Sequence, residues 1–188
     1  MTAARGVSRL AESKTFLGPL RTEQVARLLR ATNAALLAEC DQMRPSLAVW
    51  HPAEGEWCIK ECVGHMIEAE RSGFAGRIRQ ILEEPGRRLL GWDHEEVTRP
   101  RCDCQQDIGA LVNEFADERE RSVYLVESLL NTDLVKVGEH EHVGTLSVED
   151  LLHEWIHHDR NHFRQVQANI QAYVWPSMGN ARRFAEID

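Results

Sequence analysis

Four of the nine histidines in this 188-residue chain lie close together, between positions 153 and 162. They form two pairs at i, i+4 spacing, His153 with His157 and His158 with His162. Two imidazoles at this spacing leave one helix face a turn apart and can chelate a metal ion. At about 100° per residue, His158 and His162 flank the apolar arc around Trp155, whereas His153 and His157 fall on the polar side. We therefore expect the second pair to face the protein interior.

The first pair also completes a string found in zinc proteases, since residues 153–157 read H-E-W-I-H. We interpret this match to H-E-x-x-H as a coincidence. Both histidines point away from the predicted core, few residues follow His157, and the glycine of the longer metzincin motif is missing.

The second pair, His158 and His162, also has an explanation that involves no metal ion. A histidine-rich chain produces such pairs by chance, and a metal site requires a third ligand from another helix.

His65 is the natural third ligand. It lies in a stretch with helical periodicity and flanks the apolar arc that contains Cys62. Three histidines would leave one coordination position of the ion open, as in catalytic zinc sites. Glu70 points into the same arc, which is unusual for a carboxylate and requires a partner. We expect either a local pair with Arg71 or Arg77, or a hydrogen bond to a ligand histidine.

Apolar residues recur with a helical period in four segments, with approximate bounds 22–43, 58–83, 106–130 and 147–173. Thr22 and Ser147 are suitable N-caps for the first and last segments, and Asp150 stands at N3 of the last. The polar stretches between the helices show no strand pattern. We predict an all-α fold, a four-helix bundle, in three parts: an N-terminal extension (1–21), the bundle (22–175) and a C-terminal tail (176–188).

Two blocks of the sequence resemble the DinB/YfiT-like family. Residues 56–65, E-W-C-I-K-E-C-V-G-H, are similar to its pattern x-W-S-x-x-E-x-x-x-H, which an acidic residue follows five positions on, here Glu70. Residues 145–162 resemble its second pattern, T-x-x-x-L-x-H followed by H-D-x-x-H. Both blocks occur in the family's order, and the resemblance covers residues 22–173. The chain departs from the family at Cys58, where Ser or Thr is usual and a thiol is a weaker helix cap.

The resemblance implies a four-helix bundle that binds one divalent metal ion, zinc or nickel, through His65, His158 and His162. Characterised relatives are transferases or isomerases that use a low-molecular-weight thiol such as bacillithiol or mycothiol. By this comparison the chain is expected to move a small thiol onto an electrophile, and these two small molecules are its partners. A thiol at the open coordination position would lose its proton and become a nucleophile. We expect it to enter between the loops at 86–104 and 132–145.

Two other functions stay open at this point. A metal-dependent hydrolase would use water as the nucleophile and need a base close to the ion. Asp159, beside the ligand pair, and the inward-pointing Glu70 are the candidate catalytic residues. A non-enzymatic module would use the metal for stability and bind a partner. Against a purely structural zinc, no fourth protein ligand is evident in the sequence.

The five cysteines, an odd number spread along the chain, do not suggest a disulfide framework. Cys102 and Cys104 form a C-x-C pattern, and His140 and His142 form an H-x-H pattern. Together these residues could chelate a second zinc ion. The spacing is of low specificity, however, and we interpret all four as loop residues.

The composition argues against several classes of partner. With a formal net charge of −8 and no stripe of basic and aromatic residues, we expect no binding to nucleic acids. No apolar run is long enough to span a membrane, and the N-terminus lacks the apolar stretch of a secretory signal. We therefore expect a cytoplasmic protein without membrane contact. An apolar C-terminal segment would be covered in a homodimer, and its residues are Tyr173, Val174, Trp175 and Phe184.

Overall fold

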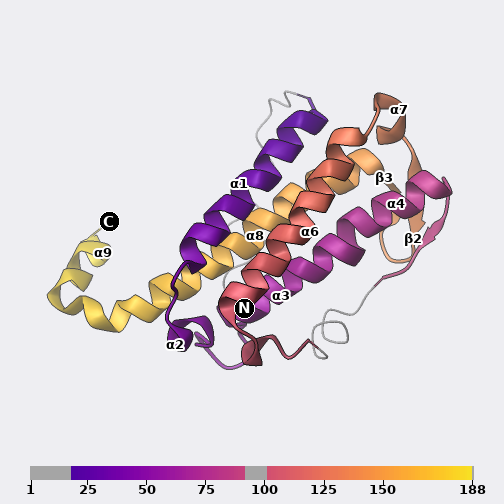
Figure 1. The fold of residues 1–188 in the computed structure, drawn as a ribbon. Helices are drawn as coiled ribbons and strands as arrows, with labels where there is room; N and C mark the ends of the chain where they lie inside the picture. The colour runs from indigo at the N-terminus through magenta and orange to yellow at the C-terminus, as the bar shows by residue number, and fades with distance from the viewer. Residues whose placement is uncertain (1–17, 92–100, 188) are drawn as a thin grey trace.

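Four long helical segments run along one another in the computed structural model, which describes residues 18–91 and 101–187 (Figure 1). They are α1 (Thr22–Cys40), a continuous segment of α3 (Ile59–Glu68), the π-helix η3 (Ala69–Phe74) and α4 (Ala75–Glu83), then α6 (Ile108–Ser128) and α8 (Val148–Val174). The predicted all-α four-helix bundle is confirmed. Residues 1–17 of the predicted extension, 92–100 of the predicted entrance loop and 188 of the predicted tail lie outside the described residues.

The order of the helices around the bundle differs from their order in the sequence. Each of α1 and α3 packs against both α6 and α8. The short helix α2 (Pro45–Ala48) and the loop after it carry the chain from α1 to α3. Because α3 and α8 are neighbours, residues more than 80 positions apart in the sequence face one another across their interface.

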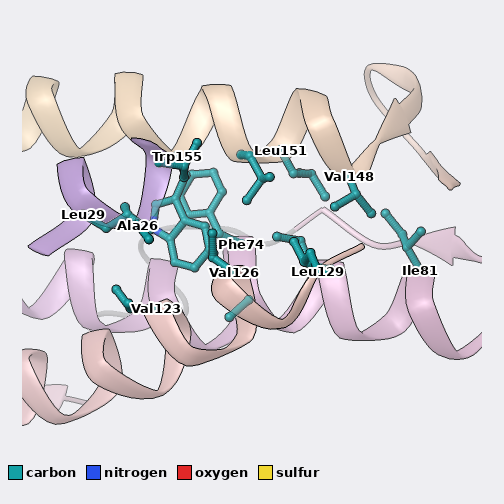
Figure 2. Close-up of a cluster of buried hydrophobic side chains, with 14 of the residues drawn as sticks. Ala26, Leu29, Phe74, Ile81, Val123, Val126, Leu129, Val148, Leu151 and Trp155 are labelled. Carbon is teal, nitrogen blue, oxygen red and sulfur yellow. The ribbon is translucent and has the colours of Figure 1, made fainter. Parts of the chain in front are cut away.

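The buried apolar side chains form two clusters along the bundle. One surrounds the stacked rings of Phe74 and Trp155, which Figure 2 shows, and the other surrounds Phe115. Between members of the two clusters, every long segment carries a buried polar residue. We call this set the polar layer; its members are Thr32 on α1, Glu70 on η3, Arg119 and Ser122 on α6, and Asp159 on α8. Buried polar groups are costly unless they are paired, so the polar layer requires partners across the bundle.

Local hydrogen bonds determine where the helices begin. The predicted N-cap Ser147 is confirmed: its Oγ accepts from the N–H of Asp150 at 3.0 Å, and the Asp150 carboxylate accepts from the N–H of Ser147 at 2.9 Å. In α1 the N-cap is Arg21 instead of the predicted Thr22. The predicted second helix is interrupted by η3, a wider turn of a kind that often marks functional sites.

The prediction that the connecting stretches contain no strands is wrong. A three-stranded sheet is formed by β1 (Arg88–Leu89), β2 (Val137–His140) and β3 (Gly144–Ser147), parallel between β1 and β2 and antiparallel between β2 and β3. Strands of two and four residues are too short to show a period of two in the sequence. The remaining described elements are α7 (Asn131–Leu134), the 3₁₀ helices η5 (Asp103–Gln105) and η6 (Trp175–Arg183), and α9 (Phe184–Ile187). Among the described helices, none has the length and apolarity needed to cross a lipid bilayer.

Candidate metal centre

Three histidine side chains converge between α3 and α8. His65 is buried on α3, and His158 and His162 are half-buried on α8. One ligand atom of each lies within 4.8 Å of the other two, and the Nε2 atoms of His65 and His158 are 2.9 Å apart. Two nitrogens bound at about 2.05 Å to one tetrahedral ion lie about 3.3 Å apart. The three ligands that the sequence predicts are thus brought together in an arrangement that one ion fits after small side-chain shifts.

A glutamine orients the third imidazole. Nδ1 of His162 lies 3.2 Å from Oε1 of Gln165. Since that oxygen only accepts, Nδ1 carries the proton, and Nε2 keeps the lone pair that a metal needs. The His162 ring centroid is 4.4 Å from those of both His65 and His158, so the three rings form one compact group.

Two aromatic side chains flank the histidines. The Trp57 ring lies 5.0 Å from the His65 ring and 5.9 Å from the His162 ring, centroid to centroid. The rings of Phe74, on η3, and His158 form a T-shaped pair with their centroids 5.1 Å apart. The side-chain amide of Asn169 donates to the carbonyl of Trp57 at 2.8 Å and so anchors the first of these rings. The aromatic rings limit contact of the imidazoles with water.

The polar layer contains an ion triad next to the histidines. Arg119 donates to Asp159 at 2.6 and 2.9 Å and lies 2.6 Å from Oε1 of Glu70, which also accepts from Nε1 of Trp155 at 2.9 Å. Burial raises the pKa of Glu70 above its ordinary value, and the charge of Arg119 offsets part of this effect. Burial alone would lower the pKa of Arg119, but the carboxylates of Asp159 and Glu70 outweigh it and raise that pKa.

The predicted local partner of Glu70 is wrong. Arg71 pairs with glutamates on the outside of the bundle, including Glu118 at 3.0 Å, and Arg77 donates to the carbonyl of Leu90 at 3.2 Å. The carboxylate of Glu70 instead reaches across to α6. A hydrogen bond from Glu70 to a ligand histidine stays a prediction, as do catalytic roles for Glu70 and Asp159.

The other histidine pair of α8 does not approach this site. Nε2 of His153 accepts from the backbone N–H of Leu20 at 2.9 Å, and its Nδ1 donates to the carbonyl of Glu149 at 2.7 Å. With both ring nitrogens in these bonds, His153 holds the segment before α1 against α8. His157 is exposed to solvent. The H-E-x-x-H string therefore does not bring its two histidines together as ligands.

A cavity of about 230 Å³ reaches His158. Its other lining residues are Ala69, Gly73, Phe74, Arg77, Gly91, His140, His142, Val143, Leu146 and Glu154. Gly91 belongs to the loop 86–104, and His140 to Val143 belong to the stretch 132–145. Residues from both loops between which we expect a thiol to enter therefore line this cavity.

Among the described residues, Cys102, Cys104, His140 and His142 do not form a group of potential metal ligands. The interpretation of all four as loop residues is wrong for His140, which ends β2, and for Cys104, which lies in η5. His140 lies beside Arg77, with Nη2 of the arginine 3.1 Å from Nε2 of the imidazole. The thiol of Cys104 lies 3.5 Å from that of Cys58 instead, and Cys102 is exposed. Burial raises the pKa of the Cys58 thiol to about 12.

Sequence reasoning missed Arg119, and a usable signal was present. Phe115, Arg119 and Val123 follow one another at i, i+4 spacing, which puts the arginine on the buried face of its helix. A single arginine at such a position predicts buried acidic partners. The parts played by Trp57 and Phe74 depend on which helices become neighbours, and no local pattern indicates them.

Comparisons with known proteins agree with this architecture. A family profile described as the DinB superfamily matches residues 28–166. Among solved structures, YfiT from Bacillus subtilis, described as "a probable metal-dependent hydrolase with an unusual four-helix bundle topology", superposes with a TM-score of 0.75 at 14% identity, over 84% of this chain and 91% of that one.

Two further solved structures share the fold. An uncharacterized protein from Clostridium difficile 630 has a TM-score of 0.59 at 12% identity, over 79% of this chain and 94% of its own. TT2238, described as a four-helix bundle protein, has a TM-score of 0.53 at 18% identity, over 78% and 98%. At these identities the likeness establishes the fold alone. No curated protein matches the sequence.

Proposed function

This chain belongs to the DinB superfamily, and on that premise we propose that it is a metal-dependent transferase. One divalent ion, zinc or nickel, is held by His65, His158 and His162, and a small thiol is transferred to an electrophile beside it. The observation that carries the proposal is the convergence of three imidazoles next to the cavity that reaches His158. Three protein ligands leave a coordination position for a small molecule, which distinguishes a catalytic from a closed structural site.

When bound, the ion supplies a Lewis acid that lowers the pKa of a thiol or of water, making either a nucleophile near neutral pH. The side chains supply binding and orientation. Trp57 and Phe74 limit access of bulk water from beside the imidazoles. Arg77 lines the cavity, where its N–H groups can bind an acidic group of the thiol or the electrophile. In the transfer, sulfur forms a bond to carbon, the bond to the leaving group breaks, and the thiol proton passes to solvent.

The positions of the carboxylates support a thiol over water. Asp159 and Glu70 both bind Arg119, so neither is well placed to accept a proton from an attacking water molecule. A thiol is far more acidic than water and needs no comparable base once a cation is beside it. We therefore propose that Asp159 and Glu70 position the histidine-bearing segments through Arg119.

A metal-dependent hydrolase is the second candidate. It is supported by Glu154, an exposed carboxylate that lines the same cavity as His158 and could accept a proton from water. The description of YfiT points in the same direction.

Calorimetry and turnover separate these functions. Glutathione and cysteine serve as probe thiols, a chlorodinitrobenzene as the electrophile, and nitrophenyl acetate as the hydrolase substrate. For a transferase we expect thiol binding only in zinc- or nickel-loaded protein, with about one proton released per thiol when titrations in two buffers are compared. Thiol transfer should be lost in His65→Ala and kept in Glu154→Gln.

The contrary outcomes are equally distinct. Ester hydrolysis that requires metal and is lost in Glu154→Gln would establish the hydrolase instead. Metal-loaded protein that neither binds a thiol nor turns over either substrate would leave the bundle as a binding module. Performing every titration in the Cys58→Ser background as well removes any metal binding by the paired thiols of Cys58 and Cys104.

A further inference from the structure

A second group of potential metal ligands lies outside the three-histidine site. His51, Cys58, Glu61 and Cys104 each offer one ligand atom, and these four atoms all lie within 4.8 Å of one another. Three segments contribute: the loop after α2, the start of α3 and the 3₁₀ helix η5. Cys58 is buried, Cys104 and Glu61 are half-buried and His51 is exposed, so an ion can reach the group from solvent.

The sulfur separation fits a shared ion better than a disulfide. The Sγ atoms of Cys58 and Cys104 are 3.5 Å apart. Two thiolates bound at about 2.3 Å to one tetrahedral zinc ion lie about 3.8 Å apart. In a disulfide the two sulfurs are only about 2.05 Å apart. A shift of a few tenths of an ångström would therefore suit a zinc ion, whereas a disulfide would require a much larger approach.

Hydrogen bonds already hold the ligands in place. Oε2 of Glu61 accepts from the backbone N–H of Cys58 at 2.8 Å. Nδ1 of His51 donates to the carbonyl of Glu56 at 2.8 Å and lies 3.5 Å from the same Glu61 oxygen. The ammonium group of Lys60 donates to the carbonyls of Cys104 and Gln106, which fixes η5 against the first turn of α3. The group is thus preorganised by contacts that do not use its two sulfurs.

We propose that His51, Cys58, Glu61 and Cys104 form a second, closed zinc site with a structural role. Four protein ligands of N, S and O type satisfy a tetrahedral zinc ion without an open position, unlike the three-histidine site. The ion ties the loop after α2 and η5 to the start of α3. Since Trp57 directly precedes Cys58 and lies against His65 and His162, this site also steadies one wall of the first. The proposal does not depend on the function of the three-histidine site.

Cobalt(II) is a direct probe, because thiolate ligation produces a sulfur-to-cobalt charge-transfer absorption in the near ultraviolet that a three-histidine site cannot produce. Metal-free protein kept under a phosphine reductant, which contains no thiol that could bind cobalt, is titrated with cobalt and then with zinc. We expect the wild type to show this absorption, to lose it when zinc replaces cobalt, and to bind about two zinc ions per chain by elemental analysis. Cys58→Ser and Cys104→Ser should each lose the absorption and about one zinc ion.

Controls keep the result tied to these two sulfurs. Serine is a good helix N-cap, so Cys58→Ser is expected to fold, which circular dichroism checks. Cys102→Ser changes an exposed cysteine two residues from Cys104 and should keep both the absorption and the zinc. Chelation should lower the melting temperature of a His158→Ala/His162→Ala variant but not of that variant with Cys58→Ser added. A wild type without the charge-transfer absorption, or one in which Cys58 and Cys104 are found as a disulfide under reductant, overturns the proposal.

Discussion

Arg119 donates two hydrogen bonds to the carboxylate of Asp159, at 2.6 and 2.9 Å, in the interior of the bundle. Asp159 directly follows His158, so this pair joins α6 to the helix that carries two of the three candidate ligands. The same guanidinium lies 2.6 Å from Glu70, and both carboxylates and the arginine are almost completely buried. The position of His158 is therefore linked to a buried ion triad rather than to apolar packing alone.

Removal of the arginine is expected to destabilise the fold strongly. In Arg119→Met two carboxylates stay buried without their cation, and breaking a buried pair in this way costs about 3–5 kcal/mol. Urea unfolding of the metal-free protein measures the change. Arg30→Met is the matched control: it breaks a solvent-exposed pair with Glu127, and should change the free energy of unfolding far less. Equal losses in the two variants would contradict a structural role of the triad.

The two histidine pairs of α8 are expected to differ in metal binding. His65→Ala, His158→Ala and His162→Ala should each reduce binding strongly at the first site, because two imidazoles alone chelate far more weakly than three. His153→Ala and His157→Ala should keep it. Elemental analysis in the Cys58→Ser background reports on this site alone. A comparable loss in His153→Ala or His157→Ala would instead favour the H-E-x-x-H string as the ligand source.

Gly64, the neighbour of His65, is expected to tolerate no side chain. A Cβ there would lie 1.9 Å from Oδ2 of Asp103, and Asp103 is held by Arg101 at 3.0 Å. Gly64→Ala should therefore cost about 1–3 kcal/mol through overpacking, although alanine favours helix. The penalty should shrink in an Asp103→Ala background, where the clash is removed. An unchanged penalty in the double-mutant cycle would argue against this contact.

The start of α8 is expected to add an acid-sensitive contribution to stability. The hydroxyl of Ser147, and then its backbone N–H, donate to Asp150 and hold the pKa of that carboxyl below its ordinary value of 3.8. Its contribution is therefore fully present above pH 3.8 and is lost as the pH falls through the lower folded-state pKa. Asp150→Asn should have a lower melting temperature than the wild type at pH 7, and the difference should disappear in acid. A difference in melting temperature that does not depend on pH would show that ionisation of Asp150 is not its cause.

A homodimer stays a prediction that the C-terminal segment supports. Trp175 is 37% and Phe184 76% exposed, which leaves apolar area for a second copy to cover. Light scattering should give twice the 21.5 kDa of one chain. The double variant Trp175→Ser/Phe184→Ser should have the mass of one chain. Tyr124 is an exposed aromatic residue on α6, and Tyr124→Ser should keep the mass of two chains. A wild-type mass of one chain at micromolar concentration contradicts the prediction.

The sequence alone determined the features that depend on neighbours within one helix. Apolar periodicity located the four long helices, the Ser147–Asp150 cap located the start of α8, and angular position separated the two histidine pairs. It also directed Glu70 into the bundle. These properties follow from a regular rise and rotation per residue, which numbering specifies before any tertiary contact forms.

Only the tertiary structure decided which of these faces meet. The partner of Glu70 is Arg119 because η3 packs beside α6, and the partner of Cys104 is Cys58 because η5 packs beside α3. Helical periodicity says which side of a helix is buried but not which helix covers it, since several arrangements of four amphipathic helices bury similar apolar area. The short sheet could not be predicted from the sequence for a related reason. Strands of two to four residues are stabilised by pairing with distant segments, not by a pattern of their own.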